Sequence, residues 1–133
     1  YIDKQFRTLA GREHTAIGGS SMGGLISLYA GILYPHTFSR FMIFSPSLWI
    51  APKIFDENLR YANYPETRIY LYGGGKEGSG MIPNLQMLRD AIAYQNANCA
   101  DRVRIRLEND PQGRHNESRW GAEFPKAVKW LFS

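Results

Sequence analysis

The five residues from Gly19 to Gly23 have the types and spacing of a serine nucleophile site. Their sequence, Gly-Ser-Ser-Met-Gly, fits the pattern G-x-S-x-G with Ser21 at its centre. In that pattern the serine occupies a sharp turn between a strand and a helix, and its hydroxyl stands clear of the sheet. An apolar stretch precedes the motif and a helical run follows it. Ser21 is therefore the candidate nucleophile.

The residues around Ser21 are suited to the same chemistry. A sharp turn brings the positions two residues before and after the serine close together, so small residues are expected at Gly19 and Gly23. The helix that begins at Met22 directs free N–H groups and its positive dipole end toward developing negative charge. The Met22 N–H is thus the candidate oxyanion donor.

Other glycine-rich motifs fit these residues less well. A dinucleotide fingerprint needs G-x-G-x-x-G, and a serine occupies the second glycine position from either Gly18 or Gly19. A phosphate-binding loop needs lysine followed by Ser or Thr, and the motif has no lysine. In the later stretch 72–80, Lys76 is followed by Glu77. The remaining alternative is a glycine-rich turn with incidental serines.

One of the three histidines lies where a base for Ser21 is needed. Reactive groups in a parallel sheet gather at the carboxyl ends of its strands, so the partner must follow a strand. His115 follows the strand expected at 101–110, whereas His14 precedes a strand and His36 follows a returning helix. His115 is therefore the candidate general base, with a surface-loop histidine as the alternative.

A carboxylate that orients His115 should come between serine and histidine in chain order. Glu77 meets this condition because it follows directly on an expected strand. Trp49 follows another expected strand and is a candidate for the wall of a substrate pocket, although a core or rim position suits it equally. Four further carboxylates remain open as the acid: Asp56, Glu57, Glu108 and Asp110.

Apolar periodicity predicts strands that alternate with helices and hence a parallel sheet. Strands are expected at 14–19, 40–47, 67–75 and 101–110, and helices at 22–35, 82–97 and 117–132. A further helix from Ile2 is expected to end with Gly11 as its C-cap. In the last helix, Pro125 produces a kink or a new start. Four residues of that helix have core spacing: Trp120, Phe124, Val128 and Leu131. Trp130 is also assigned to packing.

The composition of the 133 residues predicts a single globular unit. The net charge of +4 comes from scattered residues without a basic run, so no nucleic-acid partner is expected. No stretch has the length and hydropathy to span a membrane. Cys99 is the single cysteine, which excludes an intrachain disulfide and gives no basis for a zinc site. We expect neither metal nor organic cofactor.

Three segments resemble the putative-esterase family of the α/β-hydrolases, which includes enterochelin esterase-like, feruloyl esterase-like and esterase D-like proteins. The segments are 16–50, 69–80 and 113–132. The resemblance places the family's nucleophile at Ser21, its base at His115 and its carboxylate at Glu77. Many family members have aspartate at this last position, and some work with a serine–histidine pair alone.

The resemblance implies an α/β fold: a partial α/β-hydrolase with about four parallel strands and crossover helices, in which residues 1–133 are the C-terminal portion of one domain. The implied function is a serine carboxylic ester hydrolase that forms an acyl-enzyme on Ser21. Its small-molecule substrates would be sugar, feruloyl or siderophore esters. The alternatives are an acyltransferase related to the mycolyltransferases and a non-catalytic binding module.

In the family, further strands precede the elbow, and a loop among them supplies a second oxyanion N–H. Loss of one such donor typically lowers turnover by about 10²–10³, so we expect this chain alone to be weak or inactive. The elbow strand would also form an edge with unpaired backbone groups. Association of two copies through this edge is the expected form of any homodimer.

Overall fold

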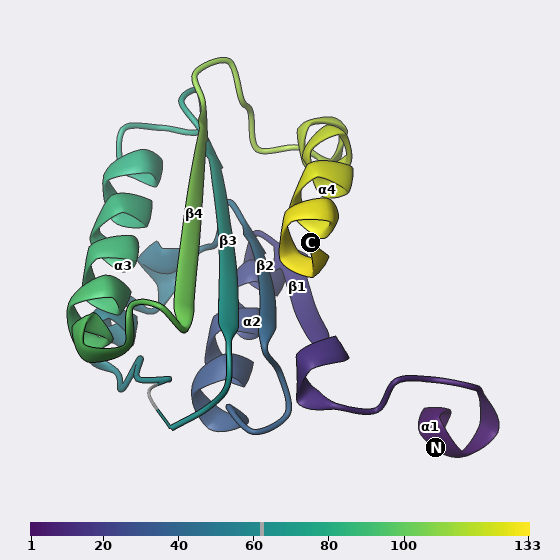
Figure 1. The fold of residues 1–133 in the computed structure, drawn as a ribbon. Helices are drawn as coiled ribbons and strands as arrows, with labels where there is room; N and C mark the ends of the chain where they lie inside the picture. The colour runs from purple at the N-terminus through teal and green to yellow at the C-terminus, as the bar shows by residue number, and fades with distance from the viewer. Residues whose placement is uncertain (62) are drawn as a thin grey trace.

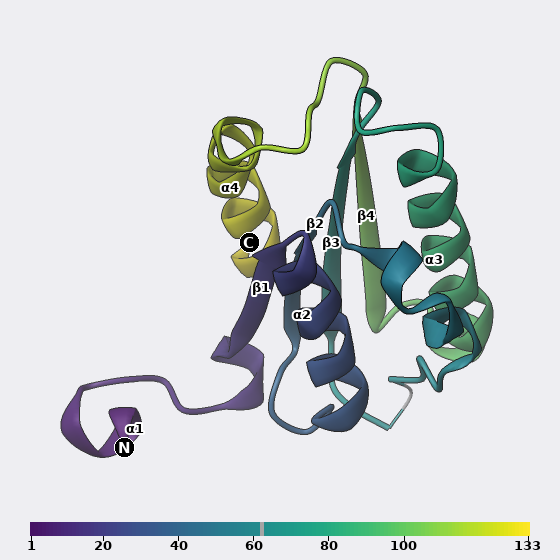
Figure 2. The same cartoon turned by 180° about the vertical axis from the view of Figure 1, so that it is seen from behind.

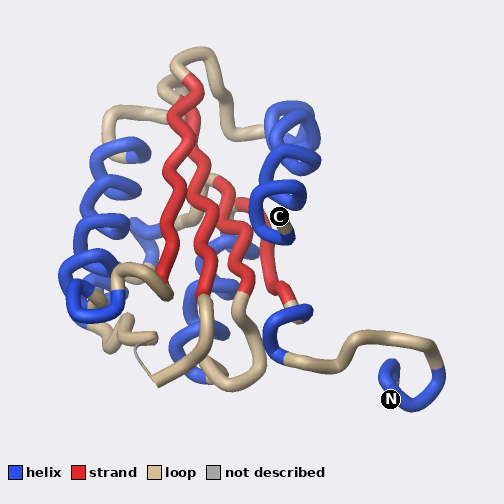
Figure 3. The backbone as a smooth tube through the Cα atoms, in the orientation of Figure 1, coloured by secondary structure: helices blue, strands red, loops and turns tan. Residues whose placement is uncertain are grey.

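The computed structural model describes residues 1–61 and 63–133 and contains one parallel sheet in the order β1-β2-β3-β4. Figure 1 shows the four strands side by side, and Figure 3 separates them from the helices by colour. The strands are β1 (Ala16–Ser20), β2 (Arg40–Phe44), β3 (Thr67–Gly74) and β4 (Val103–Asp110). The α-helices are α1 (Ile2–Gln5), α2 (Met22–Leu33), α3 (Met81–Gln95) and α4 (Glu117–Phe132). Short 3₁₀ helices are η1 (Arg12–His14), η2 (Leu48–Ile50), η3 (Pro52–Asp56) and η4 (Ala97–Cys99). The predicted α/β class is confirmed.

Helices cover both faces of the sheet. Figures 1 and 2 show α2 and α3 on one face and α4 on the other. The face under α2 and α3 holds the larger apolar core, which includes Phe41, Ile69 and Leu85. The face under α4 is aromatic, with Phe44 and Tyr72 buried against the helix. Burial on both faces explains why β2 and β3 are nearly continuous apolar runs.

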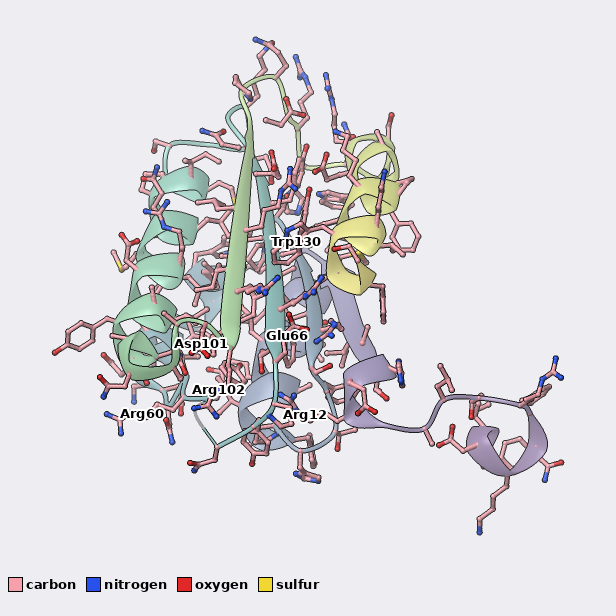
Figure 4. All side chains as sticks on the ribbon, in the orientation of Figure 1. Arg12, Arg60, Glu66, Asp101, Arg102 and Trp130 are labelled. Carbon is pink, nitrogen blue, oxygen red and sulfur yellow. The ribbon has the colours of Figure 1, made fainter. Side chains whose placement is uncertain are left out.

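Charged residues gather at the amino ends of the strands. Glu66, just before β3, lies 3.0 Å from a guanidinium nitrogen of Arg40, 3.0 Å from one of Arg68 and 3.5 Å from one of Arg104. Figure 4 labels Glu66 in this region, with Arg12 below it. Arg12 donates hydrogen bonds to the Glu66 carbonyl and to other groups of the same connection. We call Glu66 and its three ion-pair partners the arginine cluster.

The first helix is shorter than predicted. It ends at Gln5, and its apolar residues Ile2, Phe6 and Leu9 are exposed. Gly11 is the N-cap of η1, with φ −68°, and does not end a helix in the left-handed region. Apolar spacing alone predicted this helix, but no buried face supports it, and short isolated helices are marginal in water. Within the described residues, no helix combines the length and apolar character needed to cross a membrane.

The buried stripe of α4 agrees with the prediction at Leu131 but is shifted by one position before it. Glu123, Ala127 and Leu131 are buried, whereas Phe124 is exposed. Glu123 is tolerated at a buried position because it accepts a hydrogen bond from the Tyr70 hydroxyl and forms an ion pair with Lys126. The helix continues through Pro125 without a break.

Candidate active site

Ser21 occupies the turn between β1 and α2 with φ 55° and ψ −119°, a backbone conformation that is strained for a residue with a side chain. Its N–H donates to the Phe44 carbonyl at 2.9 Å, which fixes the turn to the end of β2. A Cβ at Gly19 would lie 2.6 Å from the Gly23 carbonyl carbon, so position 19 requires glycine. A Cβ at Gly23 would meet nothing within 4 Å. The close approach predicted for both glycines therefore restricts only Gly19.

His115 lies in the loop after β4, beside Ser21. Its Nε2 is 2.9 Å from the Ser21 Oγ, although 94 residues separate the two in the chain. The next residue, Asn116, is the N-cap of α4 and accepts a hydrogen bond from the Arg119 N–H. Capping fixes the start of α4 and thereby the position of the loop that carries the imidazole.

Glu77 lies on the other side of the imidazole, in the loop after β3. Its Oε2 is 2.7 Å from His115 Nδ1, and its side chain is 1% exposed. The Gly74 N–H donates to the other oxygen, Oε1, at 2.6 Å. A Cβ at Gly74 would lie 2.4 Å from the Gly113 backbone and 2.7 Å from Glu77 Oε1. Glycine at position 74 thus lets the β3 and β4 loops close around the carboxylate.

The other carboxylates considered from the sequence have different environments. Asp110 accepts hydrogen bonds from the Tyr72 hydroxyl and the Gln112 N–H. Burial opposes its ionisation, but these bonds, the charge of Arg119 and the Gly113 N–H together outweigh burial and lower the pKa of Asp110. Glu108 pairs with Arg106 on β4. Asp56 ends η3, and Glu57 follows it. Of the five carboxylates considered, Glu77 is the one that the described contacts join to His115.

Two serines that the sequence did not single out extend this chain of contacts. Ser45 and Ser47 lie in the loop after β2, and both are buried. The Ser45 hydroxyl donates to Glu77 Oε1 at 2.7 Å, and the Ser47 Oγ lies 3.2 Å from the Ser21 Oγ. The Ser47 N–H also donates to the Ser21 carbonyl. The repeated serine in Ser-Pro-Ser was the available sequence signal.

Trp120 belongs to the site in addition to the packing role that its helical spacing predicted and that its contact with the aromatic core confirms. Its indole N–H donates to the Ser45 Oγ at 2.9 Å. Its ring meets the His115 ring edge to face, with centroids 4.9 Å apart and an interplanar angle of 85°. Trp130, by contrast, packs on Tyr70 as predicted.

The remaining predicted positions are consistent with the expected direction of the sheet. Trp49 is 59% exposed, and its ring centroid is 6.3 Å from that of His115. Met22 is the first residue of α2, where backbone N–H groups have no intrahelical acceptor. His14 ends η1 just before β1, and His36 lies in the turn after α2, so both are at the amino ends of strands.

Comparison with known families decides the classification. A family model described as "Putative esterase" matches residues 1–131. The chain belongs to this esterase family. The resemblance stated from the sequence is thereby confirmed, whereas no curated protein gives a significant match.

Solved structures share the fold of this esterase-family chain. An S-formylglutathione hydrolase (FrmB) from Staphylococcus aureus aligns at 16% identity and a TM-score of 0.72, over 100% of this chain and 57% of its own. The enterobactin esterase FES from Shigella flexneri, solved with enterobactin, aligns at 22% identity and a TM-score of 0.74, over 92% of this chain and 31% of its own. The fluorophosphonate-binding serine hydrolase F (FphF) of S. aureus aligns at 15% identity and a TM-score of 0.67, over 100% of this chain and 60% of its own. The chain thus spans between about a third and three fifths of these relatives.

Proposed function

We propose that this chain carries the catalytic residues of a serine carboxylic ester hydrolase. The observation that carries the proposal is the continuous contact from Ser21 Oγ through His115 to Glu77, with distances of 2.9 and 2.7 Å. Membership of the esterase family supports the same reaction class. A nucleophile, a base and an orienting acid in this order are the requirements for acyl transfer through an acyl-enzyme.

The proposed reaction follows from the hydrogen-bond directions. Glu77 accepts a hydrogen bond from the Nδ1–H of His115, which leaves the Nε2 lone pair free to accept from the Ser21 hydroxyl. Ser21 Oγ attacks the ester carbonyl while Nε2 takes its proton, and the imidazolium returns that proton to the leaving alcohol. Water, deprotonated by the same histidine, then releases the carboxylic acid and regenerates Ser21.

The Met22 N–H is the proposed donor to the oxyanion in both tetrahedral intermediates. It lies at the N-terminus of α2, where the helix dipole also favours negative charge. In the family, a second donor comes from a segment before the elbow. We therefore propose that residues 1–133 react slowly by themselves.

The proposed substrates are small esters with the acyl or alcohol group against Trp49. This ring is exposed beside His115, so an aromatic or sugar group can stack on it. Among the solved relatives, one is named an enterobactin esterase and another a ferulic acid esterase. Siderophore, feruloyl and sugar esters are therefore the first substrates to screen.

Fluorophosphonate labelling followed by intact-mass measurement tests the proposal. We expect a single adduct on the native chain and none on Ser21→Ala. Ser20→Ala is the matched control, because Ser20 is the adjacent serine of the motif and ends β1. It should label like the native chain. An adduct that persists in Ser21→Ala, or no adduct on the native chain even after prolonged incubation, would overturn the assignment.

A further inference from the structure

We propose that Ser45 and Trp120 are positioning residues that fix the direction of hydrogen bonding through Glu77 to His115. This inference rests on the proposed function, since it assigns how the acid and base are held. It concerns a relay of two neutral donors, Trp120 and Ser45, that leads to Glu77. Neither donor is one of the three side chains of the proposed reaction.

The relay has one possible direction. An indole N–H only donates, so Trp120 makes Ser45 Oγ an acceptor, and the single hydroxyl proton of Ser45 points to Glu77 Oε1. The Gly74 N–H donates to the same oxygen. With Oε1 occupied by two donors, the carboxylate presents Oε2 as an acceptor to His115. Nδ1 therefore carries the imidazole proton, and Nε2 is left to accept from Ser21.

Burial makes this direction stable. The Ser45 residue is fully buried and the Glu77 side chain is 1% exposed, so both groups are shielded from bulk water. A buried carboxylate that loses a hydrogen bond stays partly unsatisfied, and its low-dielectric surroundings increase the penalty. The Trp120 ring also packs against the His115 imidazole in a T-shaped contact, which restricts the orientation of the imidazole.

The backbone at Ser45 gives independent evidence that the hydroxyl matters. Its φ is 43°, in the left-handed region that glycine adopts without strain. Serine at this position carries a conformational cost that glycine would avoid, and the site gains the bond to Glu77 in return. The Ser45 N–H also donates to the Tyr72 carbonyl, which ties the loop to the end of β3.

The test compares Ser45→Gly and Trp120→Phe with the native chain. Ser45→Gly removes the hydroxyl and suits the backbone, whereas Trp120→Phe removes the N–H and keeps an aromatic ring against His115. Ser39→Ala is the matched control, because Ser39 precedes β2 and its buried hydroxyl donates to the Arg12 carbonyl at the opposite end of the strand. Circular dichroism and thermal melting establish that each variant is folded.

The first readout is the nitrogen NMR spectrum of protein whose histidine rings carry a nitrogen isotope label. This spectrum reports the His115 tautomer and needs no reaction. We expect Nδ1 protonation in the native chain and in Ser39→Ala, and a mixture of tautomers in Ser45→Gly. Trp120→Phe should give a smaller shift in the same direction. A native tautomer in both folded site variants would overturn the proposal.

The second readout is the kinetics of fluorophosphonate labelling. Ser45→Gly should lower the maximal labelling rate by about tenfold and leave the half-saturating probe concentration unchanged, because the loss concerns the base and not probe binding. Trp120→Phe should lower the rate about threefold. An unchanged rate in Ser45→Gly would count against the relay. If the native chain does not label, the proposed function fails by itself, and the histidine spectra still decide the relay.

Discussion

The two ends of β3 hold a carboxylate in opposite ways. Glu66, before the strand, faces three arginines, whereas Glu77, after it, faces His115, a hydroxyl and an N–H. Burial opposes ionisation of Glu66, but the hydrogen bond and charge of Arg68, with the charges of Arg40 and Arg104, outweigh it and lower its pKa. Neutral donors hold Glu77 in place without cancelling its charge.

The surroundings of each carboxylate determine its role. A carboxylate surrounded by guanidinium groups is neutralised, and its contribution is to hold the strands together. A carboxylate held by neutral dipoles keeps its charge available to stabilise an imidazolium that forms during reaction. Replacing either carboxylate by its amide should therefore affect a different property.

Glu77→Gln should have the largest effect. The glutamine NH₂ would face Nδ1 and favour the tautomer with the proton on Nε2, so Ser21 would lose its acceptor. We expect the rate of fluorophosphonate labelling to fall by a factor on the order of 10⁴. The urea concentration at the midpoint of unfolding should change little, because the substitution acts on the reaction and not on the fold. A labelling rate within tenfold of native would contradict the proposed role of Glu77.

Glu66→Gln should show the converse pattern. Arg40 and Arg68, whose side chains are 9% and 10% exposed, would lose their compensating charge. We expect the free energy of unfolding at pH 7 to fall by about 2 kcal/mol in urea titrations. The labelling rate of the folded protein should stay native, and a large loss of labelling would show that the two ends are coupled.

The pH dependence of this loss has a fixed sign. Because folding lowers the pKa of Glu66, its stabilisation is complete above the ordinary value of 4.5 and is lost as the pH falls through the lower folded value. The difference in unfolding free energy between native and Glu66→Gln should therefore shrink below about pH 4.5. A constant difference down to acid pH would point to packing instead of charge.

Ser47→Ala tests the hydroxyl beside the nucleophile. Its Oγ lies 3.2 Å from the Ser21 Oγ and can donate there while Ser21 donates to His115. Loss of one such bond should lower the labelling rate about tenfold. Ser39→Ala again provides the comparison at the arginine end of β2. Equal rates in the two variants would remove Ser47 from the site.

Trp49→Ala should have the smallest effect. At the amino ends of the strands, Tyr64 and Trp130 lie against guanidinium groups. Trp49, by contrast, is exposed beside His115. We expect about threefold weaker binding of an aryl ester in saturation kinetics, with little change for an acetyl ester. An equal loss for both esters would indicate a general change of the loop after β2.

The sequence predicted the parts of the site that depend on strand direction. Ser21, Glu77 and His115 each follow a strand, and the parallel sheet brings such positions to one edge. The strands β2 and β3 were evident from buried apolar runs, and β4 was evident from its alternation of apolar and charged residues. Chain order narrowed the acid to a few residues, and the contact with His115 then distinguished Glu77 from Asp110.

The sequence could not predict the residues whose role depends on orientation. Helical spacing gave Trp120 a packing role, because spacing records which residues are apolar and not where an indole N–H points. The positive φ of Ser45 has no signature in a single serine. The buried stripe in α4 was misplaced before Leu131, because Glu123 is charged in the sequence and yet is buried through its contacts with Tyr70 and Lys126.

The site draws on the loop after every strand of the sheet: Ser21 after β1, Ser45 and Ser47 after β2, Glu77 after β3 and His115 after β4. A slip of one residue in any pairing would reverse which face its loop approaches. Reactivity toward a fluorophosphonate would then disappear together with the strand register. The covalent label thus serves as a chemical probe of cooperative folding, and its loss in denaturant should coincide with global unfolding of the sheet.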